Sequence, residues 1–433
     1  MLGALKEIIL NFQDSKLNCG VSRDMNISTI SGKATICIGV RRSGKSTLMF
    51  QIIDKLLKKG VKKENILYLN FFDDRLYPLQ HTELNIITEA YYSLFPEKKN
   101  SEKVYCFFDE IQLLNGWESF VERILRTENC EVYITGSSAK MLSKEIASQM
   151  RGRSVSWEIF PFSFSEFLKY NRIDQEGAFT TKKRLTVQKA FDNYFREGSF
   201  PETTGLEDSL RIKIHQEYFN AVLFRDLIER YDVFHPKSVL DLAHRLMDNI
   251  GSLYSLNNLT GYLKSLGHKV QKSTVSDYLL WFEDAYFLFT IRMFDASISR
   301  SNANPKKIYC IDHSMIRSVS SNILVNSGHL LENIVFNALR RLTTDIFYYK
   351  TKNGKEVDFI ILRQDRSKEL IQVCETMTDE NTRKREVNAL VEAMNELNLK
   401  SGTIVTKNDD EEILVENGKI NVIPAWRFLL SYE

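Results

Sequence analysis

The chain has 433 residues, of which 43% are hydrophobic and 26% are charged, and its formal net charge is +2. That length suggests about two to four domains, and the composition excludes both a disordered chain and one embedded in a membrane. A charge so close to zero also excludes a global basic field, so any surface for nucleic acid must be local. The six cysteines have no metal-like spacing, and we expect reduced thiols, a cytoplasmic location and no membrane partner.

The first motif in chain order lies at Gly39–Ser46 and fits the pattern G-x-x-x-x-G-K-[ST]. A buried strand over 35–40 precedes it and a helix over 47–57 follows, which is the context that this phosphate-binding loop requires. We expect Lys45 to reach the β- and γ-phosphates of ATP and Ser46 to ligate Mg²⁺. A chance glycine turn is the alternative. The residues expected to bind ATP are Gly39, Arg41, Arg42, Ser43, Gly44, Lys45, Ser46 and Thr47.

The second motif is an apolar run over 104–108 that ends in the acid pair Asp109 and Glu110. A continuous apolar run favours a parallel strand covered on both faces, and ligands bind at the carboxyl end of such strands. We expect Asp109 to hold Mg²⁺, directly or through water, and Glu110 to act as the general base on the attacking water. An ordinary solvated acid pair is the alternative.

The third motif is a strand over 131–135 that leads into small hydroxyl residues. Thr135 or Ser137 is expected to sense the γ-phosphate, while a simple helix cap is the alternative. Beyond it, Arg151 or Arg153 is expected to project into the ATP site of a neighbouring subunit and to neutralise transition-state charge. A solvated basic turn is the alternative for these arginines.

The order of the elements predicts the fold class. Strands over 35–40, 66–70, 105–109, 132–135 and 156–159 alternate with helices, which favours an α/β fold with a parallel, doubly wound sheet of the P-loop type. A helical stretch follows to about 248. Two short helices and an extended run then have the layout of a winged helix, with Lys264, Lys269 and Lys272 nearby. We expect these lysines to contact DNA, and a plain protein interface is the alternative. The second helix is expected to expose Leu280 and Trp281.

These motifs resemble a group of archaeal and bacterial AAA-type ATPases. The resemblance rests on the loop at 39–46, Asn70–Leu76, Asp109–Gln112, Thr135–Ser138, Gly152-Arg153, Pro161–Phe167 and Tyr194–Glu202. It implies that the strand bearing Thr135 lies between the lysine strand and the Asp109 strand. It also implies a P-loop ATPase core over 1–170, a helical lid over 171–248, a winged helix over 249–300 and a restriction-endonuclease-like domain over 301–433.

The last of these domains carries an altered motif. Restriction-endonuclease-like folds bind metal through a helix acid, a strand Asp and an E-x-K on the next strand. By that resemblance Glu332 and Asp358 keep the first two roles, but Gln372 stands for the Glu and Cys374 for the Lys. We therefore expect a degenerate nuclease-like site in a fold kept for binding DNA or protein. Active cleavage and a purely structural domain are the alternatives. The basic run at 383–385 is either a phosphate patch or a solvated helix face.

The hypothesis for the whole chain is an ATP-hydrolysing AAA-type ATPase that acts on DNA, branched DNA included. The arginine expectation implies a homo-oligomer, for which a hexamer is one possibility. Two alternatives stay open at this stage. One is an NTP-dependent regulatory switch that binds partner proteins, and the other is an ATP-regulated nuclease.

Overall fold

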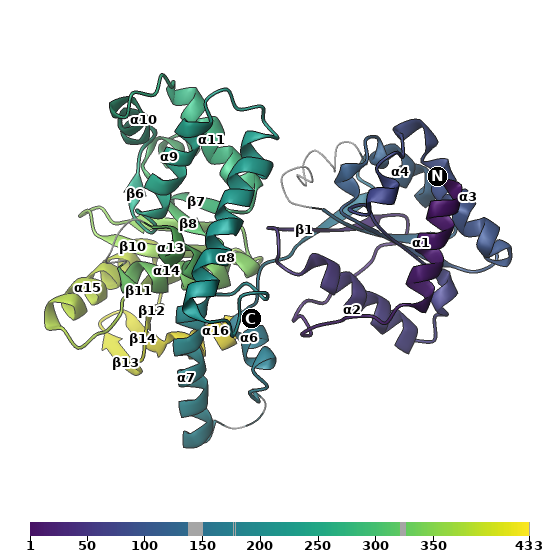
Figure 1. Cartoon of the computed structure of the whole chain (residues 1–433). Coiled ribbons are helices and arrows are strands. Elements are labelled where there is room, and N and C mark those ends of the chain that lie inside the picture. The colour runs from purple at the N-terminus through teal and green to yellow at the C-terminus, as the bar shows by residue number, and fades with distance from the viewer. Residues whose placement is uncertain (137–149, 176, 178, 321–325, 433) are drawn as a thin grey trace. The chain divides into compact units, whose positions relative to one another are not determined.

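The structure is a computed structural model, which describes residues 1–136, 150–175, 177, 179–320 and 326–432. The chain divides into two compact units, Met1–Phe160 and Pro161–Glu433, and each is described by itself. Figure 1 follows the chain through both units. The expected boundary at residue 170 falls inside the second unit.

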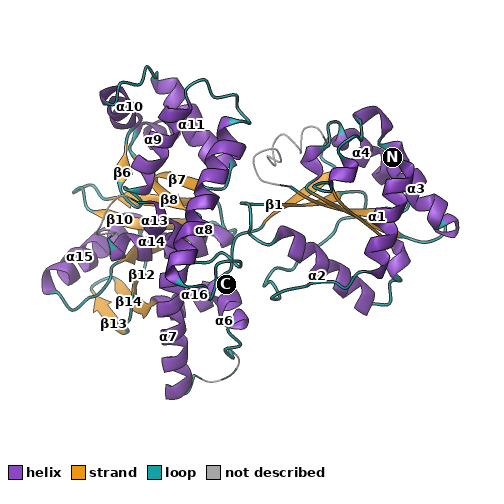
Figure 2. Ribbon diagram, in the orientation of Figure 1, coloured by secondary structure: helices purple, strands orange, loops and turns teal. Residues whose placement is uncertain are grey.

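The first unit is built on a parallel sheet, as Figure 2 shows. Among the described residues this sheet has five strands in the order β2-β3-β4-β1-β5, and every neighbouring pair is parallel. The predicted α/β class with a parallel sheet is therefore confirmed, and the strand ends differ from the predicted ones by at most two residues. The strands are β1 (Ala34–Ile38), β2 (Ile66–Asn70), β3 (Val104–Asp109), β4 (Cys130–Thr135) and β5 (Ser154–Glu158).

Successive side chains of a strand point to opposite faces of the sheet. Both faces of this sheet therefore carry apolar side chains, and helices cover both. On one face, α1 (Leu2–Asp14) and α2 (Lys45–Lys58) bury apolar side chains against Phe107 of β3. On the other face, Phe108 lies 5.8 Å from Phe120 of α4 (Trp117–Thr127), measured between ring centroids. The helix α3 (Asn85–Leu94) completes the unit beside α1. A strand buried on both sides explains why β3 reads as an uninterrupted apolar run.

The second unit begins with helices and ends with a mixed sheet. Its described strands form a nine-stranded sheet in the order β13-β14-β12-β11-β10-β9-β7-β8-β6. Its helices are α6 (Phe164–Tyr170), α7 (Thr181–Glu197), α8 (Asp208–Ala221), α9 (Pro236–Met247), α10 (Leu256–Ser265), α11 (Lys272–Asp284), α12 (Ile298–Ala303), α13 (His313–Val319), α14 (Ser327–Leu342), α15 (Glu380–Leu397) and α16 (Ala425–Tyr432). Its strands are β6 (Leu253–Tyr254), β7 (Leu288–Met293), β8 (Lys306–Cys310), β9 (Ile346–Lys350), β10 (Glu356–Leu362), β11 (Lys368–Val373), β12 (Ser401–Thr406), β13 (Glu411–Val415) and β14 (Gly418–Pro424).

The helix pair α10–α11 has the helix-turn-helix-strand order that the sequence predicts, but its strand does not stand alone. Strand β7 pairs antiparallel with β8 and parallel with β9, so it joins the C-terminal strands in one sheet. Leu280 is exposed as expected, at 54% of its surface. Trp281 is not, because its ring stacks on Tyr231 with centroids 4.2 Å apart.

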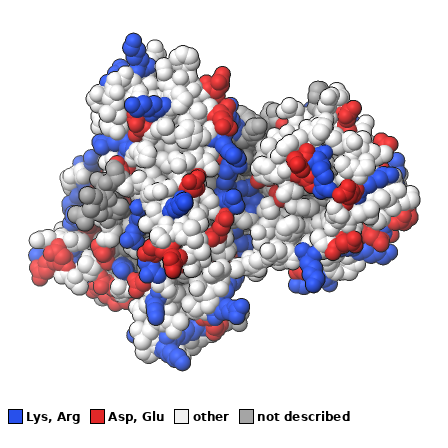
Figure 3. All heavy atoms as spheres, in the orientation of Figure 1, with Lys and Arg blue, Asp and Glu red and all other residues white. Residues whose placement is uncertain are grey.

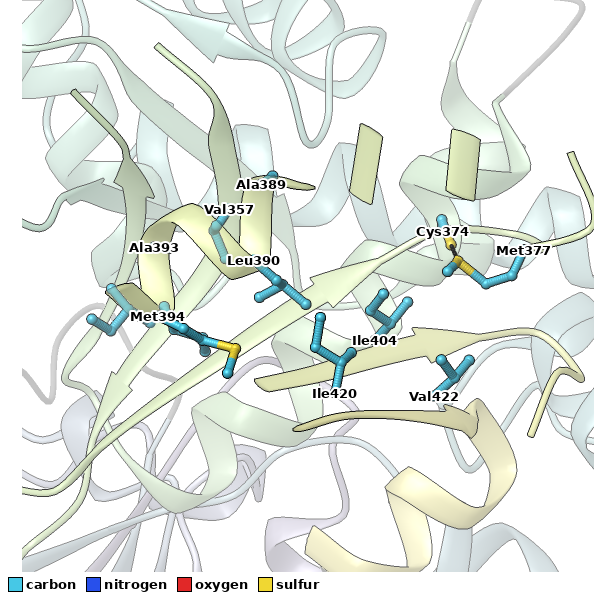
Figure 4. Close-up of a cluster of buried hydrophobic side chains, with 12 residues drawn as sticks. Val357, Cys374, Met377, Ala389, Leu390, Ala393, Met394, Ile404, Ile420 and Val422 are labelled. Atoms are coloured by element: carbon cyan, nitrogen blue, oxygen red, sulfur yellow. Dashed lines mark hydrogen bonds between the residues drawn. The ribbon is translucent and has the colours of Figure 1, made fainter. Parts of the chain in front are cut away.

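The core of the C-terminal part lies between α15 and strands β10, β11, β12 and β14. Figure 4 shows Leu390 and Met394 of α15 pointing toward Ile404 and Ile420 of the strands. The spacing of four between the two α15 side chains places them on one face of the helix. This packing holds α15 against the sheet, where its first turns also border the cavity described below.

Candidate functional site

The loop between β1 and α2 has the backbone that a phosphate-binding turn needs. Gly39 and Gly44 have φ angles of 150° and 93°, and Arg42 is left-handed at 64°. A Cβ on Gly39 would lie 2.2 Å from the carbonyl oxygen of Ile159, so only glycine fits there. The loop ends at Lys45, the first residue of α2, and the helix N-terminus points its backbone N–H groups toward the loop.

Lys45 lies inside the curve of this loop. Its ammonium group donates hydrogen bonds to the carbonyl oxygens of Gly39 and Val40 at 3.1 and 2.9 Å, and its side chain is buried. The Ser43 hydroxyl is buried in the same loop and has no hydrogen-bond partner among the described residues. An unpaired polar atom in a buried turn suits an added polar group, so the loop fits a phosphate. Arg41, Ser46 and Thr47 are half-buried around it, and Arg42 is exposed.

Arg23 supports the loop from behind and was not predicted from the sequence. Its guanidinium donates to the carbonyl oxygen of Ser43 at 2.8 Å and also to that of Phe160. Its backbone N–H donates to Gln51 of α2 at 3.2 Å. A single arginine therefore connects the loop, the helix behind it and the segment after β5. Nothing in the local sequence around Arg23 signals this role.

The acid pair at the end of β3 is held by two neighbouring strands. Asp109 is fully buried, and its carboxylate accepts hydrogen bonds from the Tyr68 hydroxyl of β2 at 2.9 Å and from the Thr135 hydroxyl of β4. The backbone N–H of Glu110 donates to the same Thr135 oxygen at 3.1 Å. In this structure Thr135 therefore orients both acids, and its expected contact with the γ-phosphate stays a prediction.

Glu110 has a strained backbone. Its φ and ψ angles of 56° and 41° are left-handed, a conformation that costs a non-glycine residue free energy. Its carboxylate accepts a hydrogen bond from the Gln112 side chain two residues further on. Strain of this kind concentrates at functional positions, and here it turns the side chain of Glu110 away from the direction that a continuing strand would give.

The strand order brings the loop and the acids to the same edge of the sheet. Strand β4 lies between β1 and β3, as the resemblance implied, and Cys37 pairs with Thr135 in the register. Burial raises the pKa of Cys37 to about 12, while the charges of Lys45 and Asp109 act on it in opposite directions. The glycine loop after β1 and the acid pair at the end of β3 therefore both lie at the carboxyl ends of parallel strands.

Three further residues were predicted for this site, and two of them are described by the structure. Ser137 falls outside the described residues. Arg153 precedes β5, where its carbonyl oxygen accepts from the N–H of Ala34 at 2.9 Å. Arg151 is in the same turn and comes within 4.0 Å of Glu122. Because β5 runs parallel to β1, this turn lies at the edge opposite Lys45, about five residues or roughly 16 Å of strand away.

A scan against family models matches residues 31–168 to an AAA domain. Residues 188–323 and 327–428 match two domains of unknown function. An uncharacterized protein of Methanocaldococcus jannaschii is 34% identical over 99% of this chain and 95% of its own length. The chain therefore belongs to the same family as this relative, and its residues 31–168 are an AAA domain. An uncharacterized protein of Haemophilus influenzae is 32% identical over 76% of this chain and 79% of its own length.

Solved structures resemble the chain more distantly. A Walker-type ATPase of Pyrococcus abyssi is 13% identical over 66% of this chain and 90% of its own, with a TM-score of 0.41. The ORC1 protein of Aeropyrum pernix in complex with DNA is 14% identical over 74% of this chain and 91% of its own, with a TM-score of 0.31. In the described part of the present chain, no helix combines the length and the apolar character needed to cross a membrane.

A second polar site lies in the C-terminal part of this AAA protein, beside a cavity of about 660 Å³. The cavity is lined by all four residues of the predicted degenerate nuclease-like site: Glu332, Asp358, Gln372 and Cys374. Glu332 comes from α14, Asp358 from β10 and Gln372 from β11, so the structure brings the predicted set together. Burial, and then the charge of Asp358, raise the pKa of Glu332 to about 7.

The group that links these acids is Lys307 of β8, which sequence reasoning missed. Its ammonium lies 2.9 Å from Glu332, 2.8 Å from Glu356 and 2.8 Å from Asp358, and its side chain is 3% exposed. Burial lowers the pKa of Lys307, but the surrounding acids outweigh this and hold its pKa well above the ordinary value. The only signal in the sequence was a pair of lysines, Lys306 and Lys307, at the start of a strand that is otherwise apolar.

The two altered positions have new partners. The Gln372 amide donates to Glu386 of α15 at 2.7 Å and accepts from the backbone N–H of Asp358 at 3.1 Å. Cys374 packs into the apolar core beside Met377, as Figure 4 shows. The sulfur atoms of these two residues lie 3.5 Å apart. The basic run at 383–385 is paired with acids, because Arg383, Lys384 and Arg385 bond to Glu411, Glu380 and Glu386.

Proposed function

We propose that the protein hydrolyses ATP with Mg²⁺ at the loop of the first unit. The observation that carries the proposal is the arrangement around Asp109. A fully buried carboxylate, oriented by hydroxyls from the strands on either side, lies at the sheet edge that also carries Lys45. An acid fixed in this way suits a metal ligand better than an incidental surface charge.

The residues divide the chemistry as follows. The loop N–H groups, Lys45 and the Ser43 hydroxyl bind the triphosphate, and the Ser46 hydroxyl and Asp109 hold Mg²⁺. When bound, Mg²⁺ neutralises the charge on the β- and γ-phosphates. Glu110 orients the attacking water and accepts its proton, while Gln112 and Thr135 keep Glu110 in place.

The arginines of the turn before β5 act between subunits in this proposal. An arginine side chain is far shorter than the roughly 16 Å that separates Arg153 from the loop of its own chain. Arg151 or Arg153 can therefore only serve a nucleotide held by another copy. The active form is accordingly an oligomer, with each ATP site completed by a neighbour.

Glu110→Gln is the variant that tests the hydrolytic role. The amide keeps the size of the side chain but cannot accept the proton, so we expect ATP to bind while single-turnover hydrolysis falls by about 10²- to 10⁴-fold. Lys45→Ala is the matched control, which should lose nucleotide binding itself. Hydrolysis by Glu110→Gln at the wild-type rate would remove Glu110 from the mechanism and with it the proposed base.

The proposed target is DNA, and the second unit carries the proposed DNA-binding surface. Three exposed lysines, Lys264, Lys269 and Lys272, flank the turn between α10 and α11. Basic side chains stand out on the end of the unit that carries these helices in Figure 3. Three phosphate contacts predict that affinity falls roughly 40-fold between 50 and 200 mM salt. ATP turnover should rise with one of single-stranded, duplex, forked or four-way DNA, and the triple Lys→Ala variant should lose that rise.

A regulatory switch that binds a protein is the second candidate, and specific side chains favour it. Phe234 is 89% exposed and Leu280 is 54% exposed, both in the part of the second unit that precedes β7. Exposed apolar side chains of this size suit a protein partner better than phosphates. ATP turnover that no form of DNA changes, together with unchanged turnover in the triple lysine variant, would favour this candidate over the first.

A further inference from the structure

Lys307 is the centre of a buried ion cluster in which every donor of its ammonium group is paired. An ammonium group has three N–H donors and no acceptor. The Lys307 ammonium contacts three different carboxylates within 2.9 Å, those of Glu332, Glu356 and Asp358. Each of the three N–H donors is thus paired with one carboxylate. No N–H of Lys307 remains to contact a nucleophile in the cavity.

The acids are also fixed by groups other than Lys307. The Tyr309 hydroxyl donates to Glu332 at 2.7 Å, and the backbone N–H of Val373 donates to the second oxygen of Asp358 at 3.0 Å. Carboxylates oriented toward one central point are the usual surroundings of a divalent cation. In this chain the central point carries a lysine nitrogen.

We propose that Lys307 is a built-in counter-ion that takes the position of a divalent metal among Glu332, Glu356 and Asp358. The pocket of this chain therefore excludes Mg²⁺ and Mn²⁺, and removal of the ammonium converts the three acids into a divalent-cation site. This inference is independent of ATP hydrolysis in the first unit.

The surroundings of the cluster agree with a cation supplied by the protein. Gln372 donates to Glu386, so a glutamate at 372 would place two carboxylates against each other beside Asp358. Arg385 already pairs with Glu386 at 2.6 Å. Each acid that borders the cluster has a protein partner, and the neutral Gln372 adds no further negative charge to the four acids that Lys307 and Arg385 partly offset.

The test measures Mn²⁺ binding to the full chain without nucleotide. Electron paramagnetic resonance detects the Mn²⁺ that stays free. We expect no saturable binding that depends on Asp358 in the wild type. Lys307→Met removes the charge but keeps the length of the side chain, and it should bind Mn²⁺ at least about tenfold more tightly. Lys307→Arg keeps a cation and is the matched control, which should gain nothing.

Folding supplies a second measurement, because Lys307→Met leaves three acids without their cation. Its melting temperature should fall without metal and recover by several degrees in about 5 mM Mn²⁺, whereas that of the wild type should not respond. The double variant Lys307→Met/Asp358→Asn should lose the recovery. The proposal is overturned if the wild type binds Mn²⁺ through Asp358. It is also overturned if Lys307→Met neither binds Mn²⁺ nor is stabilised by it.

Discussion

At the scale of single residues, one hydroxyl connects the two acids that carry the proposed chemistry. Thr135 donates to the Asp109 carboxylate and accepts from the backbone N–H of Glu110. It is thus a positioning residue, which acts through hydrogen bonds on the proposed metal ligand and on the proposed base. Loss of an outer-shell bond of this kind typically costs about 10- to 100-fold in metal affinity or activity.

Thr135→Val removes this hydroxyl and keeps the shape of the side chain. We expect ATP turnover to fall by about 10- to 100-fold, because Asp109 and Glu110 lose their common partner. Thr135→Ser keeps the hydroxyl and should retain most of the activity. Turnover measured at saturating ATP and Mg²⁺ separates the two variants, and equal rates in both would exclude the positioning role.

Arg23 allows a second prediction at this scale. Arg23→Gln should lower the free energy of unfolding by about 1–3 kcal/mol, since the buried carbonyl oxygens of Ser43 and Phe160 lose a charged donor. It should also weaken ATP binding, because the loop loses its support. Arg23→Lys keeps the charge but cannot reach two carbonyls with a planar fork, so it should restore only part of either property. Chemical denaturation and nucleotide titration measure the two effects. A full rescue by lysine would contradict the fork argument.

At the scale of elements, the loop and the segment after β5 are packed backbone to backbone. The N–H of Ile159 donates to Ile38 at 2.7 Å, and the carbonyl oxygen of Ile159 occupies the space where a side chain on Gly39 would lie. The start of the loop is therefore set by β5 as well as by its own glycines. Any displacement of this segment must move the loop.

Gly39→Ala tests this contact. A methyl group 2.2 Å from a backbone oxygen cannot be accommodated without moving β5 or the loop, and we expect a loss of more than about 2 kcal/mol of stability together with loss of ATP binding. Gly3→Ala is the control, because Gly3 lies in α1 with open space around it and alanine is the better helix former. In thermal unfolding, the melting temperature should fall below that of the wild type for Gly39→Ala and rise above it for Gly3→Ala. A stable Gly39→Ala that binds ATP would show that the loop adapts.

At the scale of the whole molecule, buried polar groups join segments of the second unit that are distant in sequence. His215 of α8 lies 3.2 Å from both the Thr203 and the Ser318 hydroxyls, and its side chain is fully buried. Burial lowers the pKa of His215 below its ordinary value, although the charge of Asp312 works against this. The folded protein therefore prefers His215 neutral, while the unfolded chain protonates it near pH 6.5.

The sign of the pH effect follows from linkage. Because the folded pKa is depressed, the stability that His215 contributes is present above pH 6.5 and is lost as the pH falls through the folded pKa. His215→Gln keeps hydrogen-bonding capacity but does not titrate. We expect the wild type to exceed this variant in free energy of unfolding at pH 7.5, and the difference to shrink steadily toward pH 5. A difference that stays constant with pH would mean that His215 keeps the same protonation in both states.

Local patterns in the chain were enough to predict the parallel sheet of the first unit and the acid pair at the end of β3, whereas the resemblance to a family supplied the four residues that line the C-terminal cavity. A strand, a glycine turn and a helix are encoded by neighbours in sequence, and so are recognisable without any long-range contact. Arg23, Tyr68 and Lys307 could not be found in this way. Each acts on groups 20 or more residues distant, and an arginine, a tyrosine or a lysine carries no local mark of the partner that folding will bring to it. Hydrogen bonds and ion pairs are formed by proximity in space, which the order of the chain constrains only through the packing of its strands and helices.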